Sequence, residues 1–209
     1  SLGINKNSIK LVDLPKEDIA HYSKGTTEVW YKWPFMDWGE LEGIANRGDY
    51  DLSQHAKYSG KDLSYFDQET KERFVPYVIE PSVGVGRAIL AFLIDAYAED
   101  DKRIILKFHP KLAPNKVAVF PLLANKEDLV AKAKKIYDNL RHSFQVAFDD
   151  RGNIGKRYLY QDEIGTPWCV TVDFQTLEDD TVTVRDRDTT KQERVNVDAL
   201  REYFAEKLT

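Results

Sequence analysis

Apolar and polar positions alternate in regular blocks through the second half of the sequence. The apolar run "KVAVFPLL" has the length of a strand, and "NKEDLVAKAKKIYDNLRH" follows it. In that second segment Leu129, Ala133, Ile136 and Leu140 fall on one face of a helix with 3.6 residues per turn. Asn125 stands where the N-cap of this helix is expected. The pattern therefore predicts a strand followed by an amphipathic helix.

The same alternation of strand and helix continues to the end of the chain. "FQVAFDD" and "PWCVTVDF" predict two strands, and "GNIGKRYLYQDEIG" between them predicts a short helix bounded by glycines. "TVTVRDRDT" and "KQERVNV" alternate with a period of two, which is typical of half-exposed antiparallel strands. "VDALREYFAEKL" predicts a closing amphipathic helix. This order indicates a mixed α/β sheet of about five strands with helices on its faces.

The first half has a less regular pattern. "PKEDIAHYSKG" indicates a short helix, "TTEVWYKWPF" an aromatic-rich strand, and "ELEGIANRGDYDLSQHAKYSG" strand-like pieces broken by glycines and then a polar loop. "DQETKERF" predicts a short helical or irregular link, and "VPYVIEPS" a strand that stops at a proline. "VGRAILAFLIDAYAED" is apolar on almost every side, as in a helix buried within a larger body.

A charged stretch interrupted by prolines, "DDKRIILKFHPKLAPNK", separates the two halves. We predict two domains, residues 1–112 and residues 113–209.

Composition narrows the class of protein. No apolar run in the 209 residues approaches the roughly 20 residues of a membrane-spanning helix, and the first residues lack the pattern of a signal peptide. Cys169 is the single cysteine and lies in an apolar, strand-like run, which predicts a buried thiol. We expect a cytoplasmic protein with no membrane partner.

The net charge is −5, which argues against nucleic-acid binding through overall positive charge. Any contact with nucleic acid has to use a local patch. The four histidines are scattered and show no metal-ligand spacing with Cys169. This favours ordinary surface or core histidines over a zinc site, and no metal ligand is assigned among them.

Candidate chemistry gathers in "YVIEPSVGVGRAIL", an extended segment that runs into a helix. It lacks the third glycine of a dinucleotide fingerprint and the Gly-Lys-Ser/Thr of a phosphate loop. One interpretation is a tight turn that uses Gly84 and Gly86 for backbone freedom, with Glu80 paired to Arg87. The other is a ligand site in which Glu80 holds a cation and Arg87 an anion or the face of an aromatic ring.

Two further groups of residues favour the ligand site. "WGELEGIANRGDYDLSQH" followed by "IEPSVGVGR" resembles glycyl-tRNA synthetase, a class II aminoacyl-tRNA synthetase, and residues 79–90 are similar to the third class II motif. "KVAVFPLL", "GNIGKRYLYQDEIGTPWCVTVDF" and "TVTVRDRDT" are similar to the anticodon-binding domain of that family. The resemblance covers roughly Ala20 to Phe204.

The resemblance implies an α+β fold: the remnant of an antiparallel class II catalytic sheet, then a mixed five-stranded α/β anticodon-binding domain. The first two class II motifs normally lie upstream and are missing here. We therefore expect the carboxyl-terminal part of a longer enzyme, a homodimer at full length, and no catalysis by this part alone.

The implied activity joins glycine to ATP, with Mg²⁺, and transfers the glycyl group to the 3′ end of tRNA(Gly). Glu80 would take the ammonium group of glycine, and Arg87 would stack on adenine. The residues that the resemblance assigns to glycine are Glu80, Pro81, Ser82, Val83 and Gly84. Those assigned to ATP or its metal ion are Glu40, Leu41, Gly84, Val85, Gly86 and Arg87.

Anticodon recognition is assigned to four basic residues of the second domain, Lys156, Arg157, Arg185 and Arg187. Arg185 and Arg187 would share one strand face and could reach splayed bases or phosphates. Surface ion pairs are the alternative for these residues. For the whole protein, the alternatives are a non-catalytic accessory subunit that binds nucleic acid, and a stand-alone RNA-binding module. An intact "EPSVGVGR" and Glu40 favour the enzyme.

Overall fold

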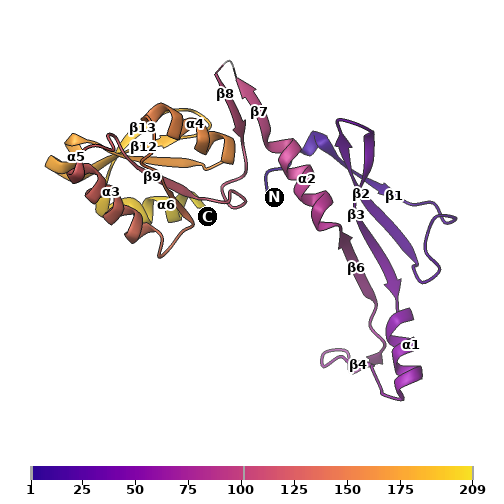
Figure 1. Cartoon of the computed structure of the whole chain (residues 1–209). Coiled ribbons are helices and arrows are strands. Elements are labelled where there is room, and N and C mark those ends of the chain that lie inside the picture. The colour runs from indigo at the N-terminus through magenta and orange to yellow at the C-terminus, as the bar shows by residue number, and fades with distance from the viewer. Residues whose placement is uncertain (1, 101, 209) are drawn as a thin grey trace. The chain divides into compact units, whose positions relative to one another are not determined.

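The computed structural model of the chain describes residues 2–100 and 102–208. The chain divides into two compact units, Ile4–Asp95 and Ala96–Thr209, the latter together with Ser1–Gly3 (Figure 1). We call them the first and the second unit. The two units meet between residues 95 and 96, upstream of the domain boundary predicted between residues 112 and 113. The predicted boundary concerns functional domains and stays a prediction.

The first unit is built on a four-stranded antiparallel sheet with the order β1-β2-β3-β6. Its strands are β1 (Ile9–Asp13), β2 (Gly25–Trp33), β3 (Asp37–Gly48) and β6 (Val78–Val83). The remaining elements are η1 (Lys6–Ser8), α1 (Tyr50–Ser59), the short hairpin β4 (Tyr65–Phe66) and β5 (Arg73–Phe74), and α2 (Val85–Ala96). The predicted antiparallel sheet is confirmed.

A small apolar core joins this sheet to α2. Tyr31 and Trp33 of β2, Leu41 of β3 and Ala91 of α2 are buried against one another. The outer side of α2 is uncovered among the described residues, and its large apolar side chains there are exposed. These are Val85, Ile89, Leu90 and Leu93. The helix was predicted correctly. The larger body expected to bury it is not supplied by the described residues.

Several details of the first unit differ from the predictions. The glycine-broken pieces form one continuous strand, β3, and the predicted polar loop is helix α1, which ends at Gly60 with φ of +70°. The expected helix in "PKEDIAHYSKG" is a series of turns. Strand β6 does not stop at Pro81, because β6 is an edge strand whose one partner in the sheet is β3, where a missing amide donor is tolerated.

The second unit holds the predicted five-stranded mixed sheet, with the order β10-β9-β11-β12-β13. Strands β10, β9 and β11 run parallel, and β12 and β13 continue antiparallel. The strands are β9 (Val117–Pro121), β10 (Val146–Phe148), β11 (Trp168–Val172), β12 (Thr181–Asp186) and β13 (Gln192–Asn196). The helices are α3 (Glu127–Leu140), α4 (Ile154–Ile164), α5 (Phe174–Asp179), η2 (Val197–Ala199) and α6 (Leu200–Leu208). A hairpin of β7 (Tyr97–Asp100) and β8 (Arg103–Leu106) precedes the sheet.

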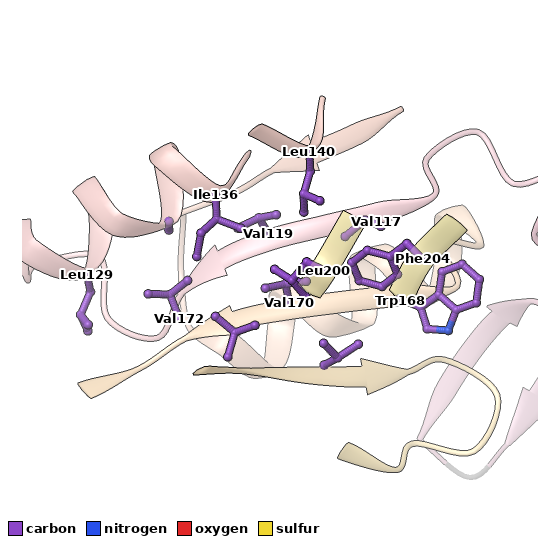
Figure 2. Close-up of a cluster of buried hydrophobic side chains, with 13 residues drawn as sticks. Val117, Val119, Leu129, Ile136, Leu140, Trp168, Val170, Val172, Leu200 and Phe204 are labelled. Carbon is purple, nitrogen blue, oxygen red and sulfur yellow. The ribbon is translucent and has the colours of Figure 1, made fainter. Parts of the chain in front are cut away.

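The core of this sheet explains why its central strands read as unbroken apolar runs. On one face α3 and α6 pack through residues such as Ile136 and Phe204 against Val119 and Val170 (Figure 2). On the other face α4 covers Ala118, Phe120 and Cys169. Because both faces are covered, every residue of β9 and β11 is buried. The predicted mixed α/β class is confirmed.

Helix ends in the second unit follow their capping residues. Asn125 is not the N-cap of α3, which is Lys126 without a side-chain bond. Asn153 caps α4 by accepting from the amide of Lys156. Asp173 and Thr176 form a reciprocal capping box that starts α5, a helix that begins at Phe174, the last residue of the predicted strand, and that was not predicted.

The Cys169 thiol is buried, as predicted, and burial raises its pKa. Among the described helices, none combines the length and apolar character that crossing a bilayer demands.

Candidate functional site

The predicted ligand residues meet where β6 turns into α2, beside β3. Antiparallel pairing places Gly43 opposite Ser82 and Ala45 opposite Glu80. Directly opposed residues project from the same face of a sheet. The side chains of Glu80 and Ser82 therefore stand beside two small residues of β3, Gly43 and Ala45.

Strand β2 continues this face. Its Glu28 lies opposite Gly43, and its Thr26 lies opposite Ala45. Tyr31 and Trp33 occupy the alternate positions of β2 and pack with α2 on the other side. The face of the sheet that carries Glu80 thus has the small residues Gly43 and Ala45 at its centre. A carboxylate stands on each neighbouring strand, Glu28 on β2 and Glu80 on β6.

Arg87, at the start of α2, lies against Glu40 of β3. Its Nη1 donates to the Glu40 carbonyl oxygen at 3.0 Å and lies 3.5 Å from Oε2 of the same residue. Both side chains are about half exposed, at 51% and 47%. The structure therefore brings together two residues predicted to bind ATP. The alternative pairing of Glu80 with Arg87 is wrong.

The partner of Glu80 is Arg47, a residue that the sequence interpretation missed. Arg47 Nη1 lies 2.7 Å from Glu80 Oε2, while its Nε and Nη2 donate to Asp51 at 2.6 and 2.8 Å. The hydrogen bonds to Asp51 and then Glu80 raise the pKa of Arg47, and the bond from Arg47 lowers the pKa of Asp51. The spacing of Arg47 and Asp51 by four residues was the one available signal.

Gly84 and Gly86 are not required by the backbone or by packing. Neither adopts a positive φ, so the interpretation that they supply backbone freedom is wrong. A Cβ built on Gly84 would meet Arg87 Cβ at 3.6 Å, an ordinary contact. A Cβ on Gly86 would have no heavy atom within 4 Å. The two glycines therefore keep open the space beside Arg87.

The other predicted ligand residues are placed less directly. Pro81 pairs with Ile44 in the sheet, and the side chains of Val83 and Val85 are exposed. Leu41 is buried in the core of the first unit, so its side chain is committed to packing. Any contact between Leu41 and a ligand would use its main chain.

The donor set suits Mg²⁺ only together with a nucleotide. Among residues 2–100 and 102–208 there is no group of three or more His, Cys, Asp or Glu side chains that could hold a metal ion alone. Mg²⁺ in proteins commonly combines one or two carboxylates with substrate phosphates and water. The half-exposed carboxylate of Glu40 fits that role beside Arg87.

Three of the four basic residues predicted to contact tRNA lie inside the second unit. Arg157 is 1% exposed, and its guanidinium donates to the carbonyls of Pro121, Arg151 and Gly152. Arg185 grips both oxygens of Asp162, at 2.9 and 3.0 Å. These contacts give both arginines an internal role.

Arg187 is internal as well. It donates to the carbonyls of Gly165 and Phe108 and to the carboxylate of Asp188. Asp162, fully buried, also accepts from Arg103 of β8 at 2.9 Å. The alternating charges of "RDRD" therefore tie β8 and the end of α4 to the sheet. Burial argues against direct tRNA contact by Arg157, Arg185 and Arg187.

Lys156 alone of the four is exposed, and it borders a surface hollow that runs along α4, from the loop before the helix to Ile164. Arg151 and Tyr160 line the same hollow, together with Asp149 and Glu163. The Arg151 side chain is 87% exposed although its Nε lies 3.0 Å from Asp149, and Tyr160 is 53% exposed. The hollow thus offers two cationic groups and one aromatic ring to a ligand.

Comparison with known proteins finds similar sequences for both units of the chain. Residues 116–207 match the family described as anticodon binding domain. Over 99% of its length the chain is 56% identical to a glycine–tRNA ligase of Thermobifida fusca and 55% identical to one of Streptomyces coelicolor. A glycine–tRNA ligase of Clostridium kluyveri is 51% identical over the same share. The predicted resemblance to this family is confirmed.

The chain spans about half the length of the curated relatives it matches: 47% of the first two and 45% of the third.

The internal role of Asp162 is testable by its removal. We expect Asp162→Ala to lower the free energy of unfolding by about 3–5 kcal/mol, because it leaves Arg185 buried without a counter-charge and Arg103 with the half-exposed Asp100 as its remaining ion-pair partner. The matched control is Asp138→Ala, which breaks an exposed pair with Arg141 and should cost about 1 kcal/mol or less. Urea unfolding followed by circular dichroism measures both. Equal costs for the two variants would contradict this assignment.

Proposed function

We propose that this chain is part of a longer glycine–tRNA ligase, which activates glycine with ATP and transfers it to tRNA(Gly). The observation that carries the proposal is the face on which Glu80 and Ser82 stand beside Gly43 and Ala45, with Arg87 and Glu40 at the adjoining corner. The identity of 56% to a named glycine–tRNA ligase supports it. The uncovered outer side of α2 suits a larger body of protein.

In this proposal the polar groups bind the two ends of an amino acid that has no side chain to grip. The Glu80 carboxylate takes the ammonium group, and the Ser82 hydroxyl supplies a further hydrogen bond. Gly43 and Ala45 let the ligand lie close to the strand backbone. A larger amino acid would have to lift its ammonium group away from Glu80 to make room for its side chain, which gives selectivity by sterics.

ATP would occupy the open space beside Gly84 and Gly86. The Arg87 guanidinium would lie flat on adenine, and its hydrogen bond to the Glu40 carbonyl would fix its orientation. Mg²⁺ bound with the nucleotide would neutralise phosphate charge, with Glu40 as its protein ligand. Positioning and charge neutralisation are what attack of the glycine carboxylate on the α-phosphate requires.

The second unit would recognise the anticodon through the hollow along α4. Lys156 and Arg151 suit phosphates, and the exposed ring of Tyr160 suits an unstacked base. The cationic groups are local, which fits a chain whose net charge is −5.

Replacement of Glu80 tests the amino-acid site. In the full-length enzyme that carries this chain, we expect Glu80→Ala to reduce glycine-dependent pyrophosphate exchange at least about a hundredfold, because the ammonium group loses its counter-charge. Glu72→Ala, an exposed glutamate between β4 and β5, is the matched control and should leave the rate unchanged. Exchange by Glu80→Ala within a few-fold of wild type would refute the assignment. A wild-type protein that binds tRNA(Gly) without any exchange would favour the accessory subunit.

Gly86→Ala tests the nucleotide site with a change that is not expected to destabilise the fold. Nothing lies within 4 Å of the added Cβ, and alanine stabilises a helix relative to glycine by about 0.5–1 kcal/mol. We therefore expect an unchanged or higher Tm together with a KM for ATP raised about tenfold, equivalent to about 1.4 kcal/mol. Gly155→Ala in α4 is the control for ATP binding. An unchanged KM for ATP would show that the space is not used by the nucleotide.

Affinity for tRNA(Gly) tests the hollow. We expect Lys156→Ala and Arg151→Ala each to weaken binding and to reduce the salt dependence by about one phosphate contact. Lys134→Ala on the exposed side of α3 is the control. Binding is measured by fluorescence anisotropy at several salt concentrations, with tRNA(Gly) and with a variant whose anticodon bases are replaced. Equal affinity for both RNAs would remove the anticodon assignment.

A further inference from the structure

Arg47 is held in place by backbone geometry as well as by its partners. On β3, Asn46 pairs with Ile79 and Gly48 with Val78, so Arg47 is the extra residue of a bulge. Gly48 has a φ of +58°, a conformation that glycine adopts readily. Arg47 lies two residues beyond Ala45, the residue opposite Glu80, so its side chain stands on the same face of the sheet as Glu80. From there it reaches the Glu80 carboxylate.

Three groups fix the guanidinium of Arg47. Asp51, in the first turn of α1, takes Nε and Nη2 through its two carboxylate oxygens. The ring of Tyr22 lies 4.0 Å from the guanidinium carbon. The remaining side, Nη1, contacts Glu80 Oε2 at 2.7 Å. A planar guanidinium with two such neighbours has little freedom, so Glu80 meets a fixed donor.

The charges of this cluster do not cancel. Arg47 carries one positive charge between the carboxylates of Asp51 and Glu80, which leaves one negative charge over. Asp51 makes two of the three ion-pair contacts to Arg47, and its side chain is 22% exposed, whereas that of Glu80 is 44% exposed. The uncompensated charge therefore lies on the more accessible carboxylate, where a cationic ligand can use it.

We propose that Arg47 is a positioning residue for amino-acid binding: it holds Oε2 of Glu80, so that Oε1 faces the ammonium group of the substrate. The inference rests on the proposed function. Asp51 completes the arrangement by neutralising Arg47, which keeps Glu80 negative. A purely structural role, in which Arg47 only ties α1 to the sheet, would change stability without a selective change in glycine binding.

The test compares Arg47→Met and Arg47→Lys in the full-length enzyme that carries this chain. For Arg47→Met we expect the KM for glycine to rise at least tenfold, with the KM for ATP within twofold of wild type. Arg47→Lys keeps the positive charge but loses the planar guanidinium. Its KM for glycine should therefore lie between that of wild type and that of Arg47→Met. Arg73→Met removes an exposed guanidinium that pairs with Asp62 and is the matched control. Pyrophosphate exchange gives the KM values, and the rise in Tm on adding glycine reports binding without turnover.

The outcomes separate the two claims. If wild type shows no glycine-dependent exchange, the proposed function fails and this inference fails with it. If wild type is active and both Arg47 variants keep the wild-type KM for glycine, or raise both KM values equally, the positioning role alone is overturned. If Arg47→Met does not fold, Arg47→Lys decides by the same ratio of KM values.

Discussion

The register between β3 and β6 is the constraint on which the first unit depends. Because side chains alternate with a period of two, a slip of one residue would move Glu80 and Ser82 to the opposite face of the sheet. In the observed register they stand beside Gly43 and Ala45, and Arg47, two residues beyond Ala45, brings a guanidinium to the same face. The turn at Gly84 then delivers Arg87 to the Glu40 carbonyl. Pairing of two backbones thus positions side chains from β3, β6 and α2.

In the second unit the corresponding role belongs to buried charge. Asp162 receives Arg103 from β8 and Arg185 from β12, and Arg187 ties the carbonyls of Gly165 and Phe108 together. Asp162 and Arg185 depend on each other most, since a buried charge without its partner is strongly unfavourable. Because the buried side of α4 is used in this network, contacts between α4 and a ligand have to come from its exposed side chains, such as Lys156 and Tyr160.

The sequence predicts most of the second unit because its strands are covered on both faces and its helices have one apolar side. Runs such as those around Phe120 and Val170 can be read without knowing their neighbours. The charges cannot be read in the same way. The arginines of "RDRD" follow the period of an exposed strand, and only the packing of β8 and α4 makes them internal. Arg47 was missed for a related reason: its partner Glu80 lies 33 residues away, and only the pairing of β3 with β6 shows that the two side chains share one face.

The single thiol of this chain, Cys169, lies 1% exposed between β9, β12 and α4. Because the one sulfhydryl among the 209 residues is buried, the native protein should react little with thiol-directed labels. A cysteine introduced at any exposed position would be the sole group to take up a fluorophore or a spin label in the native state. Movements of α1, or of the hollow along α4, can therefore be followed one site at a time without first removing a natural cysteine.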